Sequence, residues 1–225
     1  MNKNNGISAF KISQVQHKRM KMALWGIGIL LTCQSIIDPL LHSSSYNVVL
    51  MLLMPILKSK FFLLLLNGAI VACSGYILNV LRVALKPFSK WAPWFCLAFI
   101  FMLALSCILN IMNTWYIMSS NFNEFTMVST LQMMLMCTYW MLQGMWFVLV
   151  CILIFNFSGR IRENGWVLFA LLLIEKVCYL LFIRVIVNLA SMSWLFISLL
   201  TSSLYLLLYY FIYRCFEVPN DEAIA

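Results

Sequence analysis

Long apolar runs are the feature that most constrains what this chain can fold into. Stretches of about 20 mostly apolar residues recur along the whole sequence, for example FFLLLLNGAIVACSGYILNVL at 61–81. A helix rises about 1.5 Å per residue, so such a run crosses a hydrocarbon core about 30 Å thick. Only 10% of the 225 residues are charged, whereas soluble domains carry about 25%. The sequence therefore predicts an all-α, polytopic transmembrane helix bundle.

Six spans are predicted, with a basic cytoplasmic tail before them and a short cytoplasmic tail after them. The single transmembrane domain covers 22–214, and the tails cover 1–21 and 215–225. The predicted spans are about 22–41, 61–81, 93–118, 125–156, 166–190 and 193–213.

Two segments fit this pattern poorly, and either could change the number of spans to seven or eight. Residues 46–57, YNVVLMLLMPIL, are too short to cross a bilayer, so we expect them to lie in the interface or to re-enter the membrane. Residues 125–156 are long for one upright helix and short for two. A tilt, or a break near Gln143-Gly144, would accommodate them.

The distribution of basic residues sets the orientation. The formal net charge is +8, and eleven of the fifteen Lys and Arg residues fall on the N-terminal side of the predicted membrane. Lys58 and Lys60 fall on the other side, and Lys176 and Arg184 lie inside the fifth span. Because cytoplasmic loops are enriched in Lys and Arg, we expect both termini to be cytoplasmic. The eleven are Lys3, Lys11, Lys18, Arg19, Lys21, Arg82, Lys86, Lys90, Arg160, Arg162 and Arg214.

The expected partner of such a chain is the lipid bilayer. The basic residues lie between apolar runs and no aromatic-interleaved basic patch occurs, so no nucleic-acid partner is predicted. Short loops, a basic cytoplasmic side and the lack of CxxC pairs favour a bacterial inner membrane. Another membrane protein or a homo-oligomeric copy remains open as a partner.

Motifs for enzyme chemistry do not occur in the sequence. Both histidines, His17 and His42, fall outside the predicted spans, so neither a zinc site nor a haem between helices is expected. No nucleophile elbow and no phosphate-binding glycine loop is present. We predict no enzyme activity, no metal and no cofactor.

The fifth span carries the strongest functional signal. Glu175 and Lys176 lie about 14 Å along a helix that begins at Trp166, which is near the middle of a bilayer. Charged residues at this depth are rare and usually face a bundle interior or a wet cavity. At 100° per residue Glu175 and Arg184 point in nearly opposite directions, so each should have its own partner on another helix or in water.

Further polar residues in the spans could complete a polar interior. Asn110 and Asn113 share a stripe of the third span, and Gln132, Tyr139 and Gln143 share a face of the fourth. Asn188 adds an amide near the end of the fifth. These side chains could equally be hydrogen-bonding contacts between helices, each contributing about 0.6–2 kcal/mol.

Three function classes are compatible with these features, in decreasing order of preference. The first is a small permease or transporter-like protein with a polar route near Glu175, Lys176 and Arg184. The second is a non-transporting membrane interaction protein, such as an immunity, regulatory or assembly factor, in which these charges hold helices together. The third is a membrane enzyme acting on lipid. The charges in the fifth span have one further explanation, namely that the span boundaries differ and the charges lie nearer the membrane surface.

Overall fold

Six long helices form the protein in the computed structural model, which describes residues 7–42, 59–119, 125–186 and 192–218. Within those residues the chain is all-α apart from one pair of two-residue strands, so the predicted all-α fold class is confirmed. The helices are α1 (Gln14–His42), α3 (Lys60–Leu85), α4 (Ala92–Ser119), α5 (Phe125–Asn156), α6 (Gly159–Ile186) and α7 (Met192–Tyr213).

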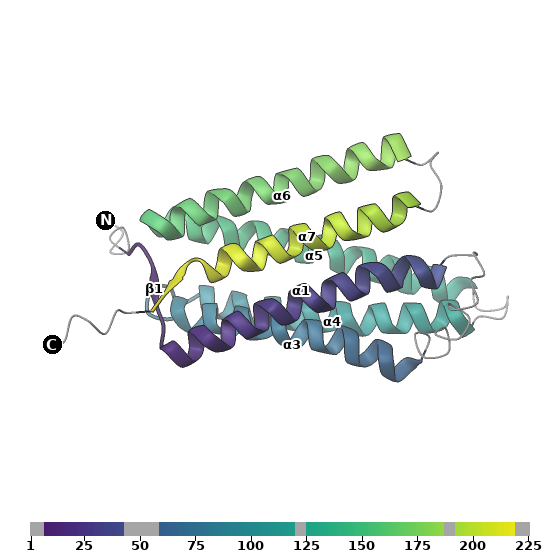
Figure 1. The fold of residues 1–225 in the computed structure, drawn as a ribbon, viewed down its shortest axis with the longest axis horizontal. Helices are drawn as coiled ribbons and strands as arrows, with labels where there is room; N and C mark the ends of the chain where they lie inside the picture. The colour runs from purple at the N-terminus through teal and green to yellow at the C-terminus, as the bar shows by residue number, and fades with distance from the viewer. Residues whose placement is uncertain (1–6, 43–58, 120–124, 187–191, 219–225) are drawn as a thin grey trace.

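The helices form a closed ring. Each helix packs against the next one along the chain, and α1 packs against α7. All six run roughly along the long axis of the molecule (Figure 1). Between α1 and α7 the contact includes a hydrogen bond that joins the hydroxyls of Ser35 and Ser202. Apolar side chains pointing into this ring form the core.

Four of the helices are long and apolar enough to cross a membrane, by length and hydropathy. In α7 the stretch Ser198–Tyr213, whose side chains are described, is a shorter apolar helix. The four membrane-length stretches are Gln14–Ile37, Phe61–Leu85, Ala92–Thr114 and Ser129–Asn156. The chain is therefore a multi-span helical bundle.

Helices α1 and α3 begin earlier than the hydropathy alone indicates. Helix α1 starts at Gln14, eight residues before the predicted span, because Ser13 and Gln16 form a capping box. The Ser13 hydroxyl accepts from the Gln16 amide at 3.2 Å, and the Gln16 side chain accepts from the Ser13 amide at 3.3 Å. In the same way the Ser59 hydroxyl caps α3 by accepting from Phe62 at 3.1 Å. The charged and polar residues just before these two apolar runs therefore form the first turns of α1 and α3.

Helix α5 resolves one of the two ambiguous segments. It is continuous over 32 residues from Phe125 to Asn156, so the alternative of a break near Gln143-Gly144 is wrong. A helix tolerates Gly144 at a cost of about 1 kcal/mol relative to alanine. The other ambiguous segment, 46–57, lies outside the described residues.

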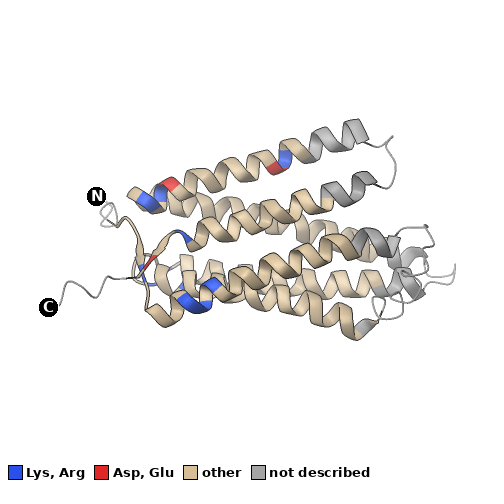
Figure 2. Ribbon diagram, viewed as in Figure 1, with Lys and Arg blue, Asp and Glu red and all other residues tan. Residues whose placement is uncertain are grey.

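One end of the bundle carries the two strands and most of the charge. Strand β1 (Phe10–Lys11) pairs in parallel with β2 (Phe216–Glu217), and we call this end the strand end. Figure 2 shows Lys and Arg gathered there, with one acidic–basic pair part-way along α6. The starts of α1 and α6, the end of α7 and the turn between α3 and α4 all meet at this end. The clustering fits the charge asymmetry of the sequence.

Residues near both chain ends are folded against the bundle, within the segments that the sequence analysis described as a basic tail and a short tail. The Phe10 amide donates to the Cys215 carbonyl at 2.9 Å, and the Ile12 amide donates to the Glu217 carbonyl at 3.1 Å. The N-terminal segment, residues 7–13, also meets the α5–α6 turn, where the Ile161 amide donates to the Ser8 carbonyl at 3.1 Å. The strand end is therefore tied together by backbone hydrogen bonds.

Aromatic rings fill the space beneath this strand pair. Phe10 is only 3% exposed, and its ring centroid lies 5.1 Å from that of Phe157 and 5.4 Å from that of Phe216. Phe88 completes this terminal aromatic cluster, 5.6 Å from Phe157 in an edge-on arrangement. Edge-to-face contacts of this kind stabilise beyond the area that they bury.

Candidate functional site

A buried carboxylate in the middle of the bundle is the centre of the candidate site. Glu175 is 6% exposed and lies on α6, sixteen residues after Gly159. At about 1.5 Å per residue this is about 24 Å from the strand end of the helix. An isolated ionised carboxylate at such a place is strongly disfavoured, so it requires partners.

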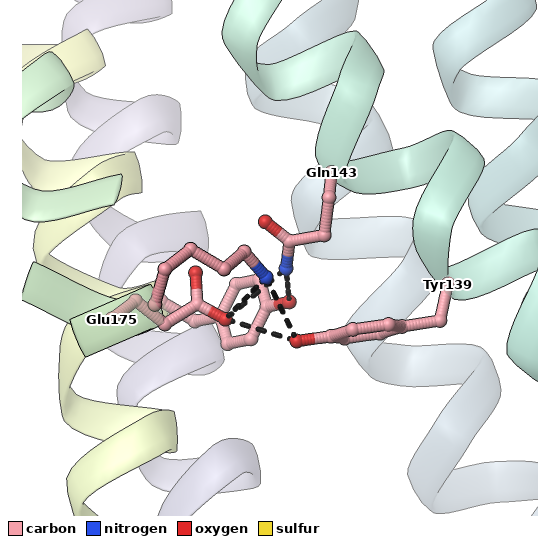
Figure 3. Close-up of polar contacts among 5 residues, drawn as sticks. Tyr139, Gln143 and Glu175 are labelled. Atoms are coloured by element: carbon pink, nitrogen blue, oxygen red, sulfur yellow. Dashed lines mark hydrogen bonds and ion pairs between the residues drawn. The ribbon is translucent and has the colours of Figure 1, made fainter. Parts of the chain in front are cut away.

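Two side chains of α5 supply those partners. The Tyr139 hydroxyl donates to Glu175 Oε1 at 3.0 Å, and Gln143 Nε2 donates to the same oxygen at 3.1 Å. Tyr139 and Gln143 are four residues apart and so lie on one face of α5. Figure 3 shows both pointing at the Glu175 carboxylate across the gap between α5 and α6.

The same glutamine extends the site to α7. Gln143 Nε2 also lies 2.7 Å from the Tyr205 hydroxyl. A glutamine amide has two protons to donate, and here both are used, one toward Glu175 and one toward Tyr205. Gln143 is itself buried, at 7% exposed. One side chain therefore joins three helices.

Lys176 places a positive charge beside the carboxylate. Its Nζ lies 3.7 Å from Glu175 Oε1, and its side chain is 32% exposed compared with 7% for that of Glu175. The ammonium donates to the Tyr139 hydroxyl at 3.4 Å. It also lies 5.0 Å from the centroid of the Tyr139 ring and 5.5 Å from that of Trp140. Such cation–π contacts stabilise a poorly hydrated ammonium group.

We call these side chains the central polar network: Tyr139, Gln143, Glu175, Lys176 and Tyr205. Its carboxylate and ammonium neutralise each other, which lowers the cost of placing either at this depth. Two neutral donors stabilise the ionised carboxylate further. This carboxylate thus connects α6 to α5, and Gln143 in turn connects α5 to α7.

An aromatic layer separates this network from the strand end. Trp146 is 1% exposed and lies three residues closer to that end of α5 than Gln143. Its ring centroid is 5.1 Å from Phe99 of α4 and 5.3 Å from Tyr209 of α7. This central aromatic cluster fills the bundle interior on the strand-end side of Glu175.

Within the described part of the chain, three other residues singled out in the sequence lie outside the network. Asn110 of α4 donates instead to Asn67 of α3 at 3.4 Å. Asn113 is partly buried, and its Oδ1 has no hydrogen-bond partner within the described part of the chain. Gln132 is exposed on α5, so it does not share the inward position of Gln143.

Two predicted residues fall beyond what the structure describes in detail. Arg184 belongs to α6, but its side chain is outside the described residues, and so is the whole of Asn188. That Glu175 and Arg184 have different partners therefore stays a prediction.

Tyr205 is the member of the network that the sequence did not single out. It lies in SSLYLLLYYFIYR, where tyrosines are typical of membrane interfaces. Its spacing gives no sign that it faces a glutamine on α5. Among the described residues, no group of three or more His, Cys, Asp or Glu side chains is placed to hold a metal ion.

Comparison with known proteins gives no relative from which a role could be taken. No protein-family model, no curated protein and no solved structure matches the chain. Any functional assignment therefore rests on the geometry of the central polar network and its surroundings.

Proposed function

We propose that the protein is a small multi-pass membrane permease in which Glu175 binds and releases the proton that accompanies a transported solute. The observation that carries this proposal is the burial of the Glu175 carboxylate among donors from α5 and its own neighbour Lys176. Ionisable groups at membrane depth are characteristic of proton relays and substrate pathways.

The coupling would arise from the contacts of the carboxylate. Ionised Glu175 holds Tyr139 and Gln143, and through Gln143 it is connected to Tyr205 of α7. A proton on Glu175 removes the charge that these donors and Lys176 stabilise. Helix α6 then loses part of its attachment to α5, and with it its indirect connection to α7 through Gln143, which is the kind of bistable contact that alternating access requires.

In this proposal the structure corresponds to a state closed toward the strand end. The central aromatic cluster and the terminal aromatic cluster both lie between Glu175 and that end. Proton and solute would reach Glu175 from the opposite side. We further propose six spans with both termini cytoplasmic, in a bacterial inner membrane, because the strand end carries the clustered Lys and Arg residues.

Flux measurements in liposomes test the proposal. The purified protein is reconstituted with a pH-sensitive dye inside, and pools of amino acids, sugars, organic amines and carboxylates are added outside. At least one pool should change the internal pH faster than in protein-free liposomes, and Glu175→Gln should abolish that change. Glu163→Gln is the matched control, because Glu163 is exposed at the start of the same helix. The absence of any pool-dependent pH change would contradict transport, and full activity of Glu175→Gln would contradict the proton-carrying role of Glu175.

A second candidate is a non-transporting membrane interaction protein. The observation that favours it is that Glu175 Oε1 already accepts two hydrogen bonds from the protein itself. In that case the network holds α5, α6 and α7 in register and handles no proton. Glu175→Gln would then lower thermal stability while the reconstituted wild type moves no solute, and a membrane partner would co-purify in fixed stoichiometry.

A further inference from the structure

A cavity at the strand end has no part in the proposed proton site. It measures about 640 Å³ and lies between the N-terminal segment, the first turns of α1 and the last turns of α3. Sites for small ligands have volumes of about 300–1,000 Å³. The cavity is thus large enough to hold part of a small molecule.

Two cations are among the residues that line this cavity. Lys11 of the N-terminal segment and Arg19 of α1 lie there with Gln16, Asn79 and Tyr76, whose side chains carry amide and hydroxyl groups. No carboxylate is among the lining residues. Two cations with neighbouring amide and hydroxyl donors are suited to a phosphate group.

Apolar residues line the cavity as well, and we call them the apolar wall. They include Phe10, Val80, Val83 and Ala84. Val83 is 53% exposed on α3, which is one of the helices long and apolar enough to cross a membrane. The apolar wall therefore continues toward the region where acyl chains would lie.

We propose that this cavity binds an anionic phospholipid. The phosphate lies between Lys11 and Arg19, and the first part of an acyl chain lies against Val83 and Ala84. Basic pockets beside membrane helices, at the depth of the head groups, are suited to such lipids. The combination of two cations with an apolar wall favours a lipid over a free phosphate. The site depends on the bundle crossing a membrane and is independent of Glu175.

Binding at this site would hold the N-terminal segment on the bundle. Lys11 belongs to β1, which pairs with β2, whereas Arg19 belongs to α1 and the apolar wall belongs largely to α3. One lipid would therefore contact three parts of the chain that are separate in sequence. Its head group would add to the backbone hydrogen bonds that already join them.

Native mass spectrometry of the full chain in detergent tests the proposal. The probes are a phosphatidylglycerol and a phosphatidylcholine with identical acyl chains. Wild type should bind the phosphatidylglycerol about tenfold more tightly than the phosphatidylcholine, and Lys11→Gln with Arg19→Gln should remove that preference. The matched control is Lys18→Gln with Lys90→Gln, which removes two exposed cations that do not line the cavity. The control should change the preference by less than about twofold.

A second variant keeps the test decisive if the charge variant does not fold. Val83→Trp fills the apolar wall at an exposed position while both cations stay in place, and it should weaken phosphatidylglycerol binding. Equal binding of both lipids by wild type would overturn the proposal. So would an equal loss of preference in the control variant. Displacement of the lipid by excess inorganic phosphate would show instead that the site takes a free anion.

Discussion

The side-chain amide of Gln143 donates to the carboxylate of Glu175 across 3.1 Å, joining α5 to α6 inside the bundle. Its other contact, to Tyr205 at 2.7 Å, joins α5 to α7. Gln143→Leu removes both hydrogen bonds while it keeps most of the side-chain volume. We expect the free energy of unfolding to fall by about 1–2 kcal/mol, measured by denaturation in mixed micelles.

Helix α5 offers a matched control for this change. Gln132 is exposed, so Gln132→Leu should leave the unfolding free energy within about 0.5 kcal/mol of wild type. If Gln132→Leu and Gln143→Leu had the same effect, the loss could not come from the central polar network.

The terminal aromatic cluster should be a main source of stability at the strand end. Phe10 is 3% exposed among Phe88, Phe157 and Phe216. Phe10→Ala should lower the unfolding free energy by about 3 kcal/mol and make residues 7–13 sensitive to protease. Phe61 is 69% exposed, so Phe61→Ala should do neither. A protease-resistant N-terminal segment in Phe10→Ala would show that its backbone bonds suffice.

Any side chain at Gly159, in the α5–α6 turn, should destabilise the protein. Its φ is +54°, and an added Cβ would lie 2.8 Å from the Ser8 Cβ. Gly159→Ala should therefore destabilise the protein by about 1–3 kcal/mol, read from thermal unfolding. Gly144→Ala is the control, since nothing lies within 4 Å of its added Cβ and it is in a helix. That change should be neutral or stabilising, and equal effects of the two would contradict the close approach of Ser8.

Cys215 should react slowly, with a distinctive pH dependence. Burial raises the pKa of its thiol to about 12, outweighing the lowering effects of Asn164, Arg160 and Arg214. The thiolate is the reactive form. Alkylation by iodoacetamide should therefore rise about tenfold per pH unit from pH 8 to pH 10 and continue to rise beyond it.

An exposed thiol at the same end of the bundle provides the comparison. Lys90 is exposed in the α3–α4 turn, and the thiol introduced by Lys90→Cys should level off near its ordinary pKa of about 8.5. Peptide mass spectrometry reads both rates in one sample. A Cys215 rate that levels off at the same pH as this control would show that the thiol is not buried.

Sequence periodicity and hydropathy predicted the helices well, because each apolar run by itself specifies a helix in a membrane. Glu175 could also be singled out from sequence, since one charge in an apolar run is conspicuous. Gln143 and Tyr139 were grouped correctly, because a four-residue spacing fixes their relative direction on a helix. Gln132 has the spacing of the same face but is exposed on α5, and helical spacing by itself does not determine how far along a face the covering helices extend.

The strand end was harder to predict because its contacts join distant parts of the chain. Phe10 and Phe216 are 206 positions apart yet occupy one register in the strand pair, and two-residue strands leave no periodic pattern. The start of α1 was a different case, because Ser13 and Gln16 carry the spacing of a capping box. Attention to that motif, rather than to hydropathy alone, would have placed the helix start correctly.

Infrared difference spectroscopy tests the central claim most directly, namely that Glu175 takes up and releases a proton within the folded bundle. The spectrum of the reconstituted protein is recorded across a pH step, and the carboxyl bands of variants are subtracted. We predict a protonated-carboxyl band that is absent in Glu175→Gln and unchanged in Glu163→Gln. A wild-type spectrum whose carboxyl bands are identical to those of Glu175→Gln would contradict this claim.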